Sequence, residues 1–300
     1  MTFSHKHDRL TDMTKFGTDP GSLHADTYIP KNFPKNGPLV VVLHGSTQSA
    51  ESYNRGSGWS DLADECGIAL LYPEQRKINN PLSSFNWFKS GDSRRGEGEP
   101  LSIRHMIEQV VDDHAIDPSR VFITGMSSGG AMASVMLATY PEVFAGGAII
   151  AGLPYRSADN LMEAMVRMKG YGGPSDHELD SLVRDASTFK GPWPTISVWH
   201  GGSDSTVDNA NADSIVRQWQ KIHKVAGAPT RVETVDGFPR QVWCNADGRE
   251  VIDEYIIEGM GHGTPIMAGG EEGLGEEDTY MLEVGISSTR HIAHFWSLTN

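Results

Sequence analysis

The chain has 300 residues and carries 25 lysines and arginines against 39 aspartates and glutamates, a formal net charge of −14 at pH 7. This length accommodates one large α/β domain or two modest ones. The acidic balance argues against nucleic-acid and anionic-membrane partners, because both are bound through clustered Lys and Arg. With 38% hydrophobic and 21% charged residues, the composition is that of an ordinary globular protein.

Two features of the sequence bear on cellular location. Residues 1–17 contain no apolar stretch like that of a signal peptide, and no segment approaches the length of a membrane span. Cys66 and Cys244 lie far apart without metal-ligand spacing, which favours free thiols. We therefore expect a cytoplasmic protein, or a secreted one if a signal peptide has been removed.

Short apolar runs alternate with helical patterns along the chain. The runs are continuous, which is typical of strands buried on both faces of a parallel sheet; they cover residues 38–45, 67–74, 120–125, 146–152 and 195–201. Apolar residues at helical spacing cover 99–114, 128–140, 208–223 and 287–297. This alternation predicts an α/β fold with a mostly parallel, doubly wound sheet and helices on both faces.

One region, residues 153–194, interrupts the alternation. It has two weak helical patterns and a Gly/Pro-rich stretch, KGYGGPSDHE, but no strand-like run. We expect it to form an excursion over the sheet edge and a wall of a cleft. Because it is too short to build its own core, we expect a single domain over residues 1–300, beginning with a polar tail at 1–20.

The stretch VFITGMSSGG, residues 121–130, combines an apolar strand with a Gly-x-Ser-x-Gly motif. The glycines flank Ser127; centring the motif on Ser128 would put Met126 where a strand-to-helix elbow needs glycine. A helical pattern without internal Gly or Pro follows at once. This context favours a nucleophile elbow with Ser127 as nucleophile over a flexible Gly/Ser loop.

A serine nucleophile needs a base within hydrogen-bonding reach, and the base needs an orienting acid. In elbow-containing folds the chain order is Ser, then Asp or Glu, then His, each in a loop after a strand. Asp204 and His262 meet this requirement. Two competing residues have other roles: His200 is expected to pack or hydrogen-bond within its loop, and Asp208 to cap the following helix.

The remaining histidines do not indicate a metal site. His5 and His7 have no acid or cysteine partner nearby in the sequence, and His291 and His294 fall in the last helical pattern, where a structural role is expected. The chemistry of a serine nucleophile requires no cofactor, and we expect none.

The oxyanion of an acyl-transfer intermediate needs preorganised N–H donors. One is expected from the backbone of Ser128, directly after the nucleophile and at a helix N-terminus. The other is expected from the loop in LHGSTQ after an early strand, either from Ser46 or from Thr47.

Several segments resemble the polyhydroxybutyrate (PHB) depolymerase family of esterases, whose members are related to feruloyl and acetylxylan esterases. They are LHGSTQ, GWSDLADECGIALLYPEQ, NNPLSSFNWF, RRGEGE, GMSSGGAMASVMLATYPEVFAGGAIIAGLPY, VWHGGSD and GMGHGTPI. The likeness runs from about Pro38 to the C-terminus. It implies an α/β-hydrolase fold in which Ser127, Asp204 and His262 form the catalytic triad.

The chain departs from the family at two cysteines. Relatives often have cysteine in LHGCTQ and again just before FNW, whereas this chain has Ser46 and Ser84. If those cysteines form a disulfide in relatives, this chain lacks it, which fits a reducing compartment. The departure also speaks against a secreted, polymer-degrading role.

The residues that contact substrate are harder to identify. Trp87, Trp199 and Tyr155 are candidates to line an acyl or aromatic pocket, while Phe88 is equally well placed in the core. The segment SGDSRRGEGEP, residues 90–100, favours a self-paired surface loop over a contact with a carboxylate or sugar.

The motifs predict a serine ester hydrolase that acts through an acyl-enzyme. The resemblance implies short hydroxyalkanoate esters, oligomers or polyesters as substrates. A feruloyl or acetylxylan esterase is the alternative in the same class. An acyltransferase would keep the triad but use a different acceptor, and a catalytically silent binding protein would fail to react with a fluorophosphonate.

Overall fold

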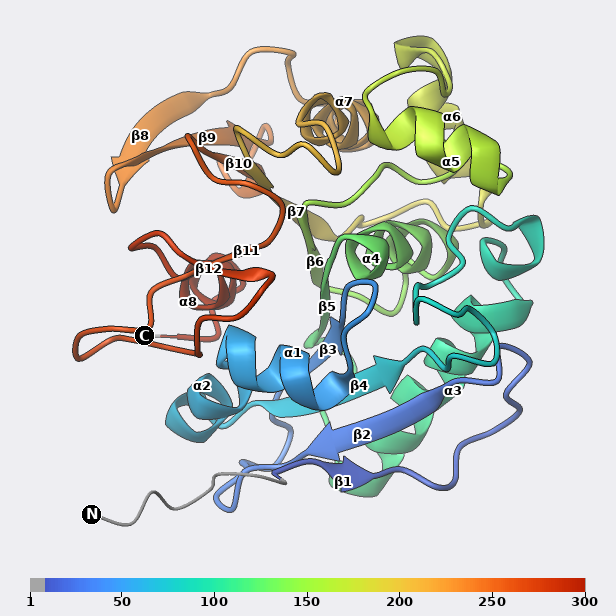
Figure 1. Cartoon of the computed structure of the whole chain (residues 1–300), viewed down its shortest axis with the longest axis vertical. Helices are drawn as coiled ribbons and strands as arrows, with labels where there is room; N and C mark the ends of the chain where they lie inside the picture. Colours follow the sequence, from blue (N-terminus) through green and yellow to red (C-terminus); the bar gives the residue numbers. More distant parts are fainter. Residues whose placement is uncertain (1–8, 300) are drawn as a thin grey trace.

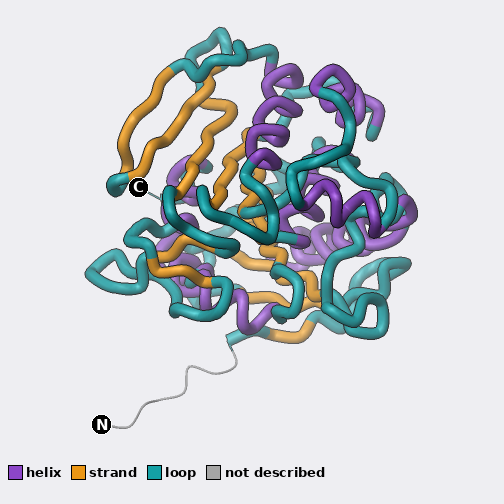
Figure 2. Tube along the Cα trace, turned by 45° about the horizontal axis from the view of Figure 1, so that its top comes forward, coloured by secondary structure: helices purple, strands orange, loops and turns teal. Residues whose placement is uncertain are grey.

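The computed structural model describes residues 9–299, and a ten-stranded sheet runs through its centre (Figures 1 and 2). The order is β1-β2-β4-β3-β5-β6-β7-β10-β9-β8. The strands are β1 (Thr11–Asp12), β2 (His24–Tyr28), β3 (Leu39–Leu43), β4 (Ala69–Glu74), β5 (Val121–Met126), β6 (Gly146–Ile150), β7 (Thr195–Gly201), β8 (Arg231–Val235), β9 (Phe238–Cys244) and β10 (Glu250–Ile257). A separate pair joins β11 (Thr264–Ile266) to β12 (Met281–Glu283).

The central strands β4, β3, β5, β6, β7 and β10 are parallel, and antiparallel strands flank them on both sides. All five predicted strands are present, and the expected α/β architecture, a mostly parallel sheet with helices on both faces, is confirmed. Their continuous apolar character has a direct cause, because helices cover both faces. Thus Leu39 and Val41 of β3 face one core, whereas Val40 and Val42 face the other.

Helices α3, α4 and α7 pack on the face of Leu39, and α1, α2 and α8 on the face of Val40. Their bounds are α1 (Ala50–Ser57), α2 (Trp59–Cys66), α3 (Gly98–His114), α4 (Ser128–Thr139), α5 (Leu161–Met168), α6 (Asp176–Asp185), α7 (Ala210–His223) and α8 (Ser288–Phe295), with a short 3-10 turn at Ser90–Asp92. Among the described helices, none is both long and apolar enough to cross a bilayer.

The excursion expected at 153–194 contains α5 and α6, and α6 packs against α7 (Figure 1). Lys169, directly after α5, contacts the loop that follows β7: its Nζ donates to the carbonyl oxygen of Ser205 (2.6 Å). Part of the segment expected as a polar tail is joined to the body: β1 pairs with β2, and Arg9 donates to Ser60 Oγ (2.9 Å).

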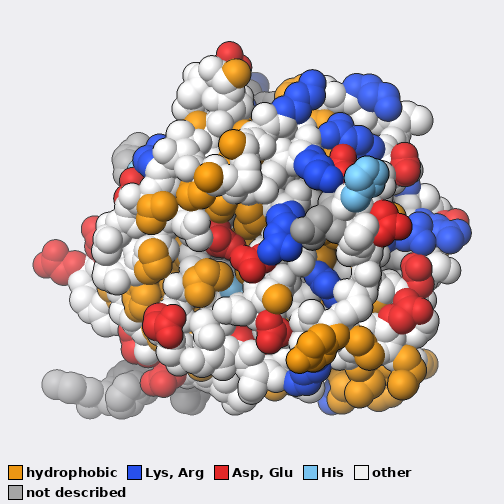
Figure 3. All heavy atoms as spheres, turned by 90° about the horizontal axis from the view of Figure 1, so that it is seen from above, with side chains coloured by type: hydrophobic (Ala, Val, Ile, Leu, Met, Phe, Trp, Pro, Cys, Tyr) orange, Lys and Arg blue, Asp and Glu red, His pale blue; other side chains and the backbone are white. Residues whose placement is uncertain are grey.

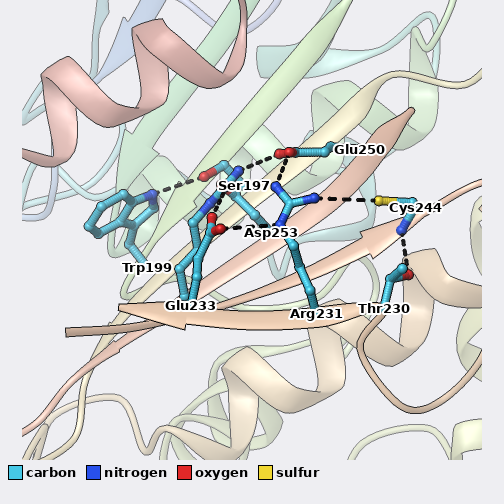
Figure 4. Close-up of polar contacts among 9 residues, drawn as sticks. Ser197, Trp199, Thr230, Arg231, Glu233, Cys244, Glu250 and Asp253 are labelled. Carbon is cyan, nitrogen blue, oxygen red and sulfur yellow. Dashed lines mark hydrogen bonds and ion pairs between the residues drawn. The ribbon is translucent and has the colours of Figure 1, made fainter. Parts of the chain in front are cut away.

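Ion pairs add to the backbone pairing of the antiparallel strands β8, β9 and β10 at one edge of the sheet. Arg231 contacts Glu233 and Glu250, and the half-buried Arg240 contacts the same two carboxylates and Asp253, as Figure 4 shows for the labelled residues. Figure 3 shows how apolar, acidic and basic side chains intermix on the upper face of the molecule.

Candidate active site

Ser127 lies in a sharp turn between β5 and α4. Its backbone has φ 55° and ψ −116°, a left-handed region that a residue with a Cβ rarely adopts. The turn is held from both sides, because the Ser127 N–H donates to Ile150 O (2.9 Å) and its carbonyl accepts from Ala131 N (2.9 Å). A serine held by hydrogen bonds in such a strained backbone conformation is typical of a nucleophile elbow.

The glycines of the motif make this turn sterically possible. A Cβ at Gly125 would lie 2.4 Å from the carbonyl oxygen of Gly129, and a Cβ at Gly129 would lie 2.3 Å from that of Leu43. Both distances are far below van der Waals contact. The strand and the helix can therefore approach each other only where side chains are absent.

Ser127, His262 and Asp204 form one hydrogen-bonded chain, although they come from three separate loops. His262 Nε2 lies 2.9 Å from Ser127 Oγ, and His262 Nδ1 lies 2.6 Å from Asp204 Oδ2. The loops follow β5, β7 and β10, which are parallel, so their carboxyl ends meet at one edge of the sheet.

The loop after β7 holds the Asp204 carboxylate in place. Oδ1 accepts from the backbone N–H groups of Thr206 (2.8 Å) and Val207 (2.9 Å), which leaves Oδ2 for His262. Burial opposes ionisation of Asp204, but hydrogen bonds from His200 and His262 hold the pKa of this carboxyl below its usual value. The carboxylate is therefore ionised throughout the neutral range and can orient the imidazole.

The two competing residues occupy the places expected for them. His200 is fully buried, and its Nε2 donates to the carbonyl oxygen of Val207 (2.8 Å) and also lies 3.4 Å from Asp204 Oδ2. Asp208 accepts from the N–H of Ala210 (2.9 Å), the first residue of α7. Neither residue contacts Ser127 or His262.

The oxyanion donors can be distinguished by what their N–H groups already bind. Thr47 N donates to the carbonyl oxygen of Leu82 (2.6 Å), so this alternative is not free to bind an oxyanion. The N–H groups of Ser46 and Ser128 have no acceptor among residues 9–299. Their hydroxyls are hydrogen-bonded at 3.2 Å, which places the two residues side by side.

The structure places the three aromatic candidates for substrate contact in the interior. Trp199 is fully buried, stacks on Tyr255 at 3.7 Å and donates from Nε1 to Ser197 Oγ (2.9 Å; Figure 4). Tyr155 is buried and donates to the carbonyl oxygen of Ser93 (3.2 Å), and Trp87 packs edge-on against Phe88. Trp87 and Tyr155 belong to the core on the Leu39 face of the sheet and Trp199 to the core on the Val40 face, so none of the three is an exposed wall of a cleft.

The segment 90–100 is exposed at 94–97 and has one internal bond, from Glu99 N to Asp92 Oδ1, but its Arg95 and Glu99 side chains pair outside the segment. Arg95 pairs with Glu142 (2.5 Å), and Glu99 is buried with 1% of its surface exposed. Glu99 accepts hydrogen bonds from Gln75 and Asn86. Burial, together with the nearby Asp92 carboxylate, raises the pKa of Glu99 to about 8.

The sequence did not predict a metal site. The structure brings one group of potential metal ligands together, and this group lies away from the triad. Ligand atoms of Asp12, His24 and Asp26 fall within 4.8 Å of one another on the terminal strands β1 and β2. Strands β4 and β3 separate them from β5. His5 and His7 lie outside the described residues.

The fold and the elbow define the class of the protein. The acetyl xylan esterase from Aspergillus awamori superimposes with a TM-score of 0.80 over 97% of this chain and 99% of that one, at 21% identity. The LpqC poly(3-hydroxybutyrate) depolymerase from Bordetella parapertussis gives 0.54 over 85% and 86%, at 15% identity. Both likenesses show the fold of the α/β-hydrolase esterases.

Sequence comparison then identifies the family. Residues 25–235 match the family Esterase PHB depolymerase. The chain is 43% identical over 291 residues to poly(3-hydroxyalkanoate) depolymerase C of Paucimonas lemoignei, covering 96% of this chain and 70% of that protein. It is 30% identical to an acetylxylan esterase of Coprinopsis cinerea, covering 86% and 70%. The chain belongs to the Esterase PHB depolymerase family and is a carboxylic ester hydrolase.

Proposed function

We propose that the chain hydrolyses short hydroxyalkanoate esters, oligomers or polyesters through an acyl-enzyme on Ser127. The observation that carries this proposal is the position of His262, hydrogen-bonded to Ser127 Oγ on one side and to Asp204 on the other. Such an imidazole can take the serine proton while the carboxylate stabilises the imidazolium.

The steps follow from this geometry. Ser127 Oγ attacks the ester carbonyl while His262 Nε2 accepts its proton. The N–H groups of Ser46 and Ser128 donate to the oxyanion of the tetrahedral intermediate. His262 then protonates the leaving alkoxide, and the ester bond breaks. Water, deprotonated by His262, attacks the acyl-enzyme and releases the acid and free Ser127.

The hydroxyalkanoate class is supported by a relative and by a surface feature. The relative of 43% identity is named for poly(3-hydroxyalkanoate) depolymerisation. Leu82, whose carbonyl oxygen accepts from Thr47 N, leaves 61% of its surface exposed beside the oxyanion loop. An exposed apolar side chain at this place suits an alkyl ester better than a sugar.

The nucleophile is tested by Ser127→Ala. The variant should fold normally, lose hydrolysis of p-nitrophenyl butyrate and fail to react with a fluorophosphonate probe. Turnover at the wild-type rate by the purified variant would refute the mechanism.

The substrate class is tested by kcat/KM for 3-hydroxybutyrate oligomers, methyl ferulate and acetylated xylose. We expect the oligomers to give the highest value. A higher value for acetylated xylose would favour the acetylxylan esterase alternative, which the relative of 30% identity supports.

We also propose a cytoplasmic location. Both cysteines are free thiols, and serines stand at positions 46 and 84 where relatives often have cysteine. Unpaired cysteines fit a reducing compartment. Fractionation of the source cells, with activity in the periplasm or medium as the contrary result, tests this location.

A further inference from the structure

Glu99, the second residue of α3, is a buried acceptor for three hydrogen bonds. Its Oε1 accepts from Gln75 Nε2 (2.5 Å) and from Asn86 Nδ2 (2.6 Å), and its Oε2 accepts from the backbone N–H of Asn86 (2.9 Å). Gln75 and Asn86 are themselves only 2% exposed. Burying a carboxyl group to 1% exposure is costly unless it is hydrogen-bonded. Both oxygens of Glu99 have partners, which indicates that the surrounding residues are arranged to hold it.

One route leads from Glu99 to the oxyanion loop through Gln75 and His44. The backbone N–H of Gln75 donates to His44 Nε2 (3.1 Å), so the ring proton lies on Nδ1, which donates to the carbonyl oxygen of Gly45 (2.7 Å). Burial lowers the pKa of His44 and keeps it in the neutral form that this pattern requires.

The fixed carbonyl sets the direction of the next N–H. In a trans peptide the C=O of Gly45 and the N–H of Ser46 point in opposite directions. Holding the carbonyl oxygen against His44 therefore directs the Ser46 N–H away from the ring. Ser128, whose N–H is the other expected oxyanion donor, is the neighbour of Ser46 across the elbow, because the two serine hydroxyls are 3.2 Å apart.

A second route reaches the other end of the same loop through Asn86 and Asn80. Asn86 Oδ1 accepts from Asn80 Nδ2 (3.1 Å), and Asn80 Oδ1 accepts from the N–H of Leu82 (3.0 Å). The carbonyl oxygen of Leu82 accepts from Thr47 N. Thr47 has φ 68°, an unfavourable conformation for a β-branched residue, so it persists only where neighbours hold it.

We propose that Glu99 is a positioning residue that holds the Ser46 N–H in the geometry required to stabilise the oxyanion. This inference rests on the proposed function. Both ends of the 45–47 turn are tied to one carboxyl group, so its loss should loosen the turn without removing a group that touches substrate. Because the oxyanion exists only in the transition state and intermediate, kcat should fall while KM changes little.

The first test is Glu99→Gln, assayed at pH 9, above the pKa of about 8, where the wild-type carboxylate accepts with both oxygens. The substitution keeps the size but replaces one acceptor oxygen by a donor NH2 that faces other donors. Removing an oxyanion donor lowers kcat about 100- to 1,000-fold, so loosening one should lower kcat for p-nitrophenyl butyrate about 10- to 100-fold, with KM within about twofold. The Ki of butylboronic acid, whose tetrahedral adduct places an oxygen in the oxyanion hole, should rise by a similar factor.

The matched control is Glu254→Gln. Glu254 is 3% exposed on β10, and its carboxyl group accepts from Gln241, away from the oxyanion loop. The control should keep kcat and the boronic acid Ki within about twofold of wild type. Circular dichroism at the assay temperature verifies that both variants are folded.

A milder variant covers the case in which Glu99→Gln does not fold. Asn80→Ala breaks only the second route, at a half-buried position, and should lower kcat about 3- to 10-fold with KM unchanged. The double variant His44→Ala/Glu99→Gln should lose no more than about twice what the worse single variant loses, because both residues act through one loop.

Three results would overturn the proposal: wild-type kcat in folded Glu99→Gln or Asn80→Ala, an equal fall in Glu254→Gln, or an unchanged boronic acid Ki. Ser127→Ala separates this failure from failure of the mechanism. If Ser127→Ala is inactive and Glu99→Gln has wild-type kcat, only the role of Glu99 is refuted.

Discussion

A Cβ atom at position 129 would lie 2.3 Å from the carbonyl oxygen of Leu43, so Gly129 sets how closely α4 approaches β3. Leu43 ends the strand that leads into the oxyanion loop, and Gly129 follows the two serines of the elbow. The nucleophile and the oxyanion loop are thus held together by a contact between two backbones.

Gly129→Ala should therefore damage both stability and activity. The methyl group meets backbone that cannot move aside, and overpacking of this kind costs about 1–3 kcal/mol or more. We expect a lower midpoint of denaturant unfolding and a large loss of kcat. Gly227→Ala is the control, because a Cβ there meets no atom within 4 Å. Equal midpoints for the two variants would contradict this interpretation of the elbow.

Asp204→Asn should leave the fold intact and lower kcat by about 10⁴, because an amide can hold His262 in the wrong tautomer. The backbone N–H groups of Thr206 and Val207 can still donate to the amide oxygen, which is why the loop should survive. Asp208→Asn is the matched control, since Asp208 only caps α7, and it should keep kcat near the wild-type value. A comparable loss of kcat in both variants would show that the loss comes from a disturbed loop and not from the missing Asp204 carboxylate.

Trp199→Phe should affect stability and not substrate binding. The indole is fully buried, stacks on Tyr255 and donates to Ser197, so its truncation leaves a cavity and removes one buried hydrogen bond, at a cost of about 2 kcal/mol. Urea unfolding and Michaelis–Menten kinetics on p-nitrophenyl butyrate measure the two effects. A severalfold rise in KM without loss of stability would restore Trp199 as a substrate contact.

Glu254→Gln should change how stability depends on pH. Burial, with the Asp213 and Asp253 carboxylates nearby, raises the pKa of Glu254 to about 7, whereas an ordinary glutamate titrates near 4.5. A raised pKa contributes stability that is complete below pH 4.5 and is lost as pH rises to about 7. The variant lacks this loss, so relative to wild type it should gain about 3 kcal/mol between pH 4.5 and 8.

Unfolding midpoints measured across this pH range check the prediction. Glu271→Gln, which removes an exposed carboxylate, controls for the substitution itself. If the difference between Glu254→Gln and wild type does not change across this range, the pKa of Glu254 is not raised in the folded protein.

The parallel half of the sheet could be predicted from the sequence because burial on both faces leaves continuous apolar runs, as in Leu39–Leu43. The edge strand β8 left no such signal, since all of its side chains are exposed or half-buried and it is held by its pairing with β9 and by the ion pair of Glu233 with Arg240. The elbow could be predicted from the sequence because its glycine spacing is a local steric requirement.

The rest of the site depended on contacts that sequence spacing does not encode. Trp199 follows a strand pattern whether its ring faces a cleft or a core, and only its packing on Tyr255 decides. Glu99 reads as one more charge in a polar loop, yet its partners Gln75 and Asn86 lie 24 and 13 residues away. The available signal was the accumulation of amide side chains in 75–86, which suit a buried carboxyl partner.

Ser127 and His262 are separated by 135 residues, and no shorter piece of the chain contains both. His262 follows β10, so it can reach the serine only when β10 lies in its place between β7 and β9. Catalytic turnover is thus a reporter of completed folding. In a refolding experiment, the recovery of esterase activity should lag behind the recovery of helical circular dichroism, and the delay measures the time that β10 takes to join the sheet.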